Sequence, residues 1–94
     1  MKRIKNKKVK VGGQETNYAD LITTCVKAVD PQQGATIDEM RKAMKVLDIT
    51  EKAGDEMKFE DAEMQHIKEK VEAMKWAIMD RGIIQFVDDI NDNS

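Results

Sequence analysis

Apolar residues recur at helical spacing in four separate stretches of the chain. The first stretch begins at Tyr18, directly after Asn17, a residue type that favours helix N-caps. Pro31 ends this stretch, because the residue before a proline avoids the helical conformation. The apolar positions all fall on one side of the predicted helix, and they are Tyr18, Leu21, Ile22, Cys25, Val26 and Val29. The pattern therefore predicts a first helix with one continuous buried stripe.

A capping-box pattern opens the second predicted helix, because Thr36 and Glu39 can each satisfy a free backbone N–H. Three basic residues of this helix are expected to face water, and they are Arg41, Lys42 and Lys45. The apolar side is expected to face the core, and its residues are Ile37, Met40, Ala43, Met44 and Leu47. The pattern fades after Ile49, and Gly54 suits the position after a helix end.

The third predicted helix starts at Glu60 or Asp61 and is expected to be the longest element and the centre of the fold. Its apolar positions alternate at spacings of three and four, and they are Met64, Ile67, Val71, Met74 and Ile78. Gly82 is expected to break it, and a short fourth helix follows over Ile83, Phe86, Val87 and Ile90. Residues 57–59 alternate too briefly to predict more than an extended connector.

The first 16 residues allow two interpretations. Val9 and Val11 alternate with lysines before Gly12 and Gly13, an acceptable two-residue hairpin turn. A lysine-rich stretch without aromatic residues is equally typical of a disordered arm. The sequence thus predicts an all-α fold, a small bundle of three main helices and a short C-terminal helix behind a basic arm or hairpin. The expected division is an arm over 1–16, one helical domain over 17–90 and a disordered acidic tail over 91–94.

Composition narrows the class of protein. The chain has 94 residues, enough for one domain, and only four aromatic side chains. Its single cysteine, Cys25, lies within an apolar stripe, which favours a buried thiol and a reducing compartment. No stretch approaches the about 20 apolar residues of a membrane helix, and the basic start is not followed by the apolar run of a secretory signal. We therefore expect a cytoplasmic protein, without membrane association.

Charge is distributed unevenly along the chain. The first ten residues carry six basic side chains and no acid, whereas the other ten basic residues and all 18 acidic residues lie within 15–94. Such an arm can contact an anionic partner, and the candidate nucleic-acid-binding residues are Lys2, Arg3, Lys5, Lys7, Lys8 and Lys10. Stacking aromatics are missing from the arm, and it has one arginine. The alternative is a solvated arm that rests on the acidic tail.

Several patterns that suggest chemistry are better explained without it. Asp88, Asp89 and Asp92 match a magnesium-binding pattern, but they lie at the end of an acid-rich chain. His66 flanks an apolar stripe, and we expect it to be exposed, with Glu63 and Glu69 raising its pKa. Acids in the first turn of the second helix disfavour a helix-turn-helix reader of DNA. No acid, base and nucleophile converge, so we predict no enzyme, no metal and no cofactor.

Trp76 falls nearly opposite the face of the third predicted helix that contains Met74 and Ile78, yet Ala73, Ala77 and Met79 make this end of the helix apolar on all sides. A tryptophan there either packs under the short last helix or anchors a partner, because tryptophan is frequent among interface hot spots. The candidate partner-binding residues are Trp76, Met74 and Met79. Methionines at 40, 44, 64, 74 and 79 suit either an adaptable interface or a core that has few aromatics.

The order of features from Thr36 onward resembles small proteins encoded by phages and prophages. The similar runs are Thr36–Arg41, Met57–Glu63 and Ile83–Ile90, with Trp76 between the last two. The resemblance implies an accessory or assembly protein of a phage and carries no catalytic residue with it. We therefore predict a non-enzymatic protein–protein interaction or assembly protein, which can self-associate. The alternative is a nucleic-acid-binding or regulatory protein that uses the basic arm.

Overall fold

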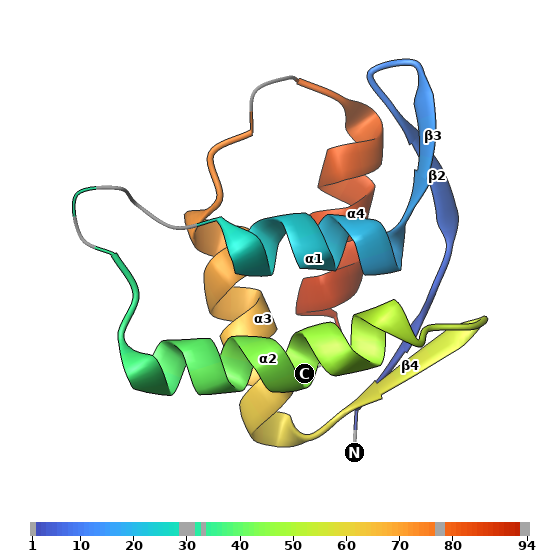
Figure 1. Ribbon diagram of the computed structural model, residues 1–94. Helices are drawn as coiled ribbons and strands as arrows, with labels where there is room; N and C mark the ends of the chain where they lie inside the picture. Colours follow the sequence, from blue (N-terminus) through green and yellow to red (C-terminus); the bar gives the residue numbers. More distant parts are fainter. Residues whose placement is uncertain (1, 29–31, 33, 77–78, 93–94) are drawn as a thin grey trace.

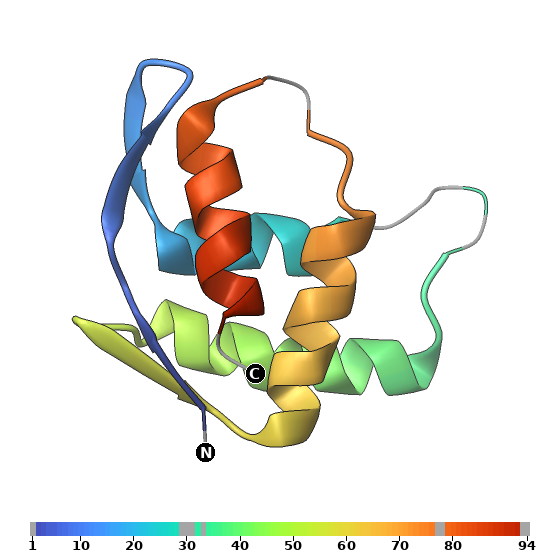
Figure 2. The ribbon, with the colours of Figure 1, turned by 180° about the vertical axis from the view of Figure 1, so that it is seen from behind.

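The computed structural model describes residues 2–28, 32, 34–76 and 79–92, which contain four helices and four strands (Figure 1). The strands are β1 (Lys2–Lys5), β2 (Lys8–Val11), β3 (Gln14–Asn17) and β4 (Glu56–Phe59). The helices are α1 (Tyr18–Lys27), α2 (Ile37–Glu51), α3 (Asp61–Ala73) and α4 (Arg81–Asn91). In both ribbon views the strands lie along one side of the helices (Figures 1 and 2).

The strands form two antiparallel two-stranded sheets, β1 with β4 and β2 with β3. The prediction of an all-α bundle is therefore wrong, and the fold is mixed α and β. The second sheet is the hairpin that the glycine pair allowed: Gly12 and Gly13 have φ angles of 61° and 80°. Both angles lie in the left-handed region, which a tight hairpin turn requires and which glycine adopts without steric cost.

The first sheet joins parts of the chain that are distant in sequence. Ile4 of β1 lies opposite Met57 of β4, and Lys2 lies opposite Phe59. Ile4, Met57 and Phe59 are buried. Their neighbours along the two strands, Arg3, Lys5 and Lys58, are exposed. The connector predicted over 57–59 is thus a strand, because its two apolar side chains complete a core face together with β1.

The predicted helix starts are confirmed by their caps. The Asn17 side chain accepts a hydrogen bond from the Asp20 N–H at 2.9 Å, and the Thr36 hydroxyl accepts one from the Glu39 N–H at 3.1 Å. At the start of α3, the Glu60 N–H donates to the Glu63 carboxylate at 2.8 Å. These bonds satisfy backbone donors that a helix leaves without internal partners.

The predicted helix ends are less accurate. α3 ends at Ala73, where Met74 takes an extended conformation, and its 13 residues make it shorter than α2 with 15. The prediction that the third helix is the longest is therefore wrong. Its central position is observed, since α3 contacts α1, α2, α4 and β4. Val29 and Pro31, at the predicted end of the first helix, and Ile78 lie outside the described residues.

Gly82 lies within the first turn of α4 rather than ending a helix. The N-cap of α4 is Asp80, whose carboxylate accepts hydrogen bonds from the N–H groups of Gly82 at 2.8 Å and Gly12 at 3.0 Å. A Cβ at position 82 would lie 2.7 Å from the Lys10 carbonyl oxygen and 2.8 Å from a methyl of Val9. The glycine is needed because the hairpin packs directly on the start of α4.

Phe86 of α4 belongs to the core, and its ring is completely buried. Its centroid lies 5.1 Å from that of Tyr18 and 6.4 Å from that of Trp76, both in edge-to-face arrangements. These contacts fix α4 against α1 and the segment after α3. Cys25 is buried as predicted, and burial raises the pKa of its thiol to about 12.

His66 is buried, so the prediction of an exposed histidine is wrong. Burial lowers the pKa of its imidazole, and Lys70 contributes, because both disfavour the charged form. Its Nε2 atom has no hydrogen-bond partner among the described residues. The sequence pattern missed this position because α3 is covered from several sides and has more than one buried face.

Candidate protein-docking surface

The first half of α2 has an exposed apolar surface. Ile37 is 61% exposed, Met40 47% and Met44 57%, although all three were predicted to face the core. Of the same predicted stripe, Leu47 is buried and Ala43 is half-buried. The apolar stripe is wider than the part of α2 that the other elements cover, and we call the exposed part, Ile37, Met40 and Met44, the α2 face.

A groove lies beside the α2 face, where the end of α1 meets α2. Its volume is about 210 Å³. The lining side chains come from α1, α2, α3 and the residue before α2, and they are Val26, Lys27, Ala35, Glu39, Met40, Ala43, Met44, Leu47 and Lys70. Most of them are apolar, so a side chain that enters the groove would be removed from water on several sides.

Two basic side chains, Lys27 and Arg41, and one exposed acid, Asp48, which lies four residues after Met44, are found at the edge of this surface. Lys27 lines the groove, and Arg41 is exposed on α2, four residues after Ile37 and three before Met44. Residues three and four apart are neighbours on a helix surface. The one acid that lines the groove, Glu39, is 3.8 Å from the Lys70 ammonium, which offsets its charge. The α2 face is therefore an apolar surface with a cationic border.

The three residues predicted to bind a partner differ in their exposure to solvent. Trp76 is half-buried against Phe86, and Met74 is half-buried against the core. Met79 is fully exposed. Sequence reasoning missed the α2 face because periodicity does not show how much of an apolar stripe is covered. The methionines at 40 and 44 were the signal for it.

The basic residues of the predicted arm lie on β1, β2 and the link between them. Arg3, Lys5, Lys8 and Lys10 are exposed, and Lys2 is half-buried. Lys7 forms an ion pair of 3.3 Å with Asp89 of α4. One contact of the kind expected between the arm and the acidic C-terminal region is thus present.

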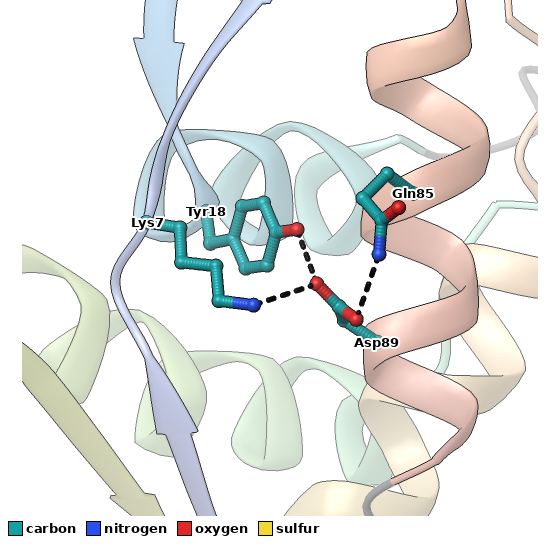
Figure 3. A network of polar contacts seen from close by, with 4 residues as sticks. All are labelled: Lys7, Tyr18, Gln85 and Asp89. Atoms are coloured by element: carbon teal, nitrogen blue, oxygen red, sulfur yellow. Dashed lines mark hydrogen bonds and ion pairs between the residues drawn. The ribbon is translucent and has the colours of Figure 1, made fainter.

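Asp89 is the centre of a polar network between three elements (Figure 3). Its carboxylate accepts hydrogen bonds from the Tyr18 hydroxyl at 2.5 Å, the Lys7 ammonium at 3.3 Å and the Gln85 amide at 3.0 Å. The Tyr18 hydrogen bond lowers the pKa of Asp89, and burial followed by this same bond raises the pKa of Tyr18. The network fastens α4 to α1 and to the link between β1 and β2.

This arrangement gives Asp89 a structural role. The carboxylate is held in its ionised form by donors, and the tyrosine is held in its neutral form, so neither group is set up as a general base. Three acids, Asp88, Asp89 and Asp92, match a magnesium-binding pattern that we interpret as a chance match. Asp89 is engaged in this network, and Asp88 and Asp92 are exposed. In the described part of the chain, no group of three or more metal-binding side chains could hold an ion.

We expect Asp89→Asn to lower the free energy of unfolding by about 1–2 kcal/mol at pH 7, because a charged acceptor is lost. The pKa of Asp89 is below its ordinary value of 3.8 in the folded protein. The stabilisation is therefore complete above that value and is lost as the pH falls through the folded pKa. Urea unfolding of both proteins at neutral and acidic pH measures this. Equal stabilities at pH 7 would contradict the role given to the network.

No family model, no curated protein and no solved structure matches this chain. None of the described helices is long and apolar enough to cross a membrane.

Proposed function

We propose that this protein is a non-enzymatic interaction protein that docks a helix of a partner protein on the α2 face. The observation that carries the proposal is the exposure of three large apolar side chains next to an apolar groove. Because each of these side chains is about half exposed, covering the rest of it would contribute on the order of 1 kcal/mol, and covering all three would stabilise a complex appreciably. The phage setting implied by the resemblance stays a prediction.

The proposed partner is an amphipathic helix with acidic residues beside its apolar stripe. Methionine side chains are flexible and adapt to the shape of an apolar ligand, and Met40 and Met44 form most of the surface. Lys27 and Arg41 at its edge would attract acids and repel a basic helix. A helix in this position would extend the layer of α1 and α2 by one further helix.

Charge also favours a different protein over a second copy of this one. In a symmetric dimer each surface meets itself across a two-fold axis. Arg41 lies along the edge of the α2 face, at a level between Ile37 and Met44, so a dimer whose two-fold axis passes near this level would bring two Arg41 side chains together. An acidic partner would not cause this repulsion, and we therefore propose a different protein as the partner and not a second copy of this one.

The test uses two designed helical peptides with the same apolar stripe, one flanked by glutamate and one by lysine. We expect fluorescence anisotropy to show tighter binding of the acidic peptide. Met40→Ser with Met44→Ser should weaken it at least tenfold, since about 1.4 kcal/mol of lost burial corresponds to that factor. The matched control, Met79→Ser with Ile84→Ser, removes two exposed apolar side chains elsewhere and should bind as the wild type does.

Two results would contradict the proposal. The first is equal binding of the two peptides, or none at all, because the cationic border would then have no role. The second is a dimer in light scattering that Met40→Ser with Met44→Ser dissociates, because the α2 face would then be covered by a second copy.

A further inference from the structure

The two sheets carry basic side chains on their outward sides. In β1, Ile4 is buried and its neighbours Arg3 and Lys5 are exposed. In β2, Val9 packs against the core and its neighbours Lys8 and Lys10 are exposed. Because side chains alternate between the two sides of a strand, the apolar residues that hold each sheet on the helices turn the basic residues toward solvent.

Strand pairing adds a basic residue that lies far away in sequence. Lys58 of β4 is exposed and lies directly opposite Arg3 in the register of the first sheet. Like charges in directly opposed positions destabilise a sheet. The acids of the two sheets offset only part of this charge: Glu56 lies opposite Lys5 and 3.9 Å from Arg3, and Glu15 lies opposite Lys10. We call Arg3, Lys5, Lys8, Lys10 and Lys58 the ribbon face.

We propose that the ribbon face binds the sugar–phosphate backbone of nucleic acid, without sequence preference. Basic residues two positions apart on a strand are separated by about 6.6 Å. A DNA duplex also carries its charges in a regular row, one phosphate per about 3.4 Å of helix axis on each strand. The regular row of basic residues on each sheet favours such a polyanion over an acidic protein surface, whose charges are irregularly placed. Arginine and aromatic side chains provide most base recognition. The ribbon face contains one arginine, Arg3, and four lysines, so we expect binding without sequence preference.

The location of the ribbon face makes this inference independent of the α2 face. Both ribbon views place the start of α2 at one end of the molecule and the strands at the opposite end (Figures 1 and 2). Lys7, which lies between β1 and β2, is engaged by Asp89 and is not part of the ribbon face. A partner helix and a nucleic acid could therefore be bound at the same time.

The experiment measures binding of the full chain to a fluorescent duplex of about 20 base pairs, in a series of salt concentrations. If three to five phosphates are neutralised, the affinity should fall about 40- to 500-fold between 50 and 200 mM salt. The variant with Arg3→Gln, Lys5→Gln, Lys8→Gln and Lys10→Gln should lose most of the binding and of the salt dependence. The matched control changes Lys42, Lys45, Lys52 and Lys75, all exposed, to glutamine and gives the same net charge.

The comparison of the two variants tests whether the ribbon face itself binds the duplex. Loss of binding in the ribbon variant alone supports the inference. Equal loss in both variants would show an effect of total charge, and absence of binding at 50 mM salt would leave the lysines as protection of exposed strand edges; either overturns it. Polyglutamate binding as tightly as the duplex would favour an acidic protein instead. Separate double variants, Arg3→Gln with Lys5→Gln and Lys8→Gln with Lys10→Gln, keep one sheet unchanged if the other fails to fold.

Discussion

Phe86→Ala is expected to destabilise the protein by about 3–5 kcal/mol, the usual cost of removing a buried aromatic ring. The Phe86 ring is completely buried and contacts both Tyr18 and Trp76, so its loss leaves a cavity and removes two aromatic contacts. A domain of this size has about 5–15 kcal/mol of stability in total. Urea unfolding followed by circular dichroism should therefore show a protein that is barely folded or unfolded.

Ile84→Ala is the matched control, because Ile84 lies on the same helix and is 62% exposed. Truncation there should change the free energy of unfolding by less than about 0.5 kcal/mol. A loss below about 1 kcal/mol for Phe86→Ala would contradict the position of α4, since a ring that packs between two others cannot be removed at so small a cost.

Gly82→Ala is expected to destabilise the protein by about 1–3 kcal/mol, the range typical of overpacking. The sign is informative, because a glycine-to-alanine change inside a helix ordinarily stabilises it by up to about 1 kcal/mol. Here the added methyl would meet the Lys10 carbonyl oxygen at 2.7 Å and Val9 at 2.8 Å. The hairpin of β2 and β3 would have to move away from α4, which chemical denaturation can measure.

Gly54→Ala provides the comparison for this change. A Cβ at position 54 meets no heavy atom within 4 Å, and Gly54 is not among the glycines with positive φ. That substitution should be neutral or stabilise the protein by up to about 1 kcal/mol, because it restricts the unfolded chain. If Gly82→Ala stabilised the protein as well, the close packing of the hairpin on α4 would be refuted.

Local signals in the sequence predicted local structure well. Asn17 and Thr36 cap helices as expected, because a cap depends on residues three positions apart and needs no distant partner. Gly12 and Gly13 form the hairpin turn for the same reason. The apolar stripe of α1 is buried over its described length, from Tyr18 to Val26, with Cys25 as a small apolar side chain within it.

Features that depend on distant parts of the chain were not predictable. β4 forms only because Ile4 supplies a partner strand from the other end of the sequence. Gly82 looked like a helix breaker because the sequence gives no sign of the backbone of β2 next to it. His66 is buried because elements on several sides cover α3, whereas a single periodic stripe predicts one buried face.

The candidate sites also combine features that the local sequence predicts with features that depend on distant parts of the chain. The basic residues were recognisable from composition, but their arrangement on one side of two sheets, together with Lys58, follows from the pairing register. The α2 face was assigned to the core because its period is that of any amphipathic helix. Whether an apolar stripe is covered depends on the length and position of the neighbouring helices, which the stripe does not encode.

The most direct test of the docking proposal is a nuclear magnetic resonance titration of the isotope-labelled full chain with the acidic helical peptide. We predict chemical-shift changes at Ile37, Met40 and Met44 and at the groove residues Lys27 and Lys70, with the hairpin of β2 and β3 unaffected. Changes centred on Trp76 and Met79 instead, or no changes at peptide concentrations up to the millimolar range, would contradict the assignment of the α2 face as the docking surface.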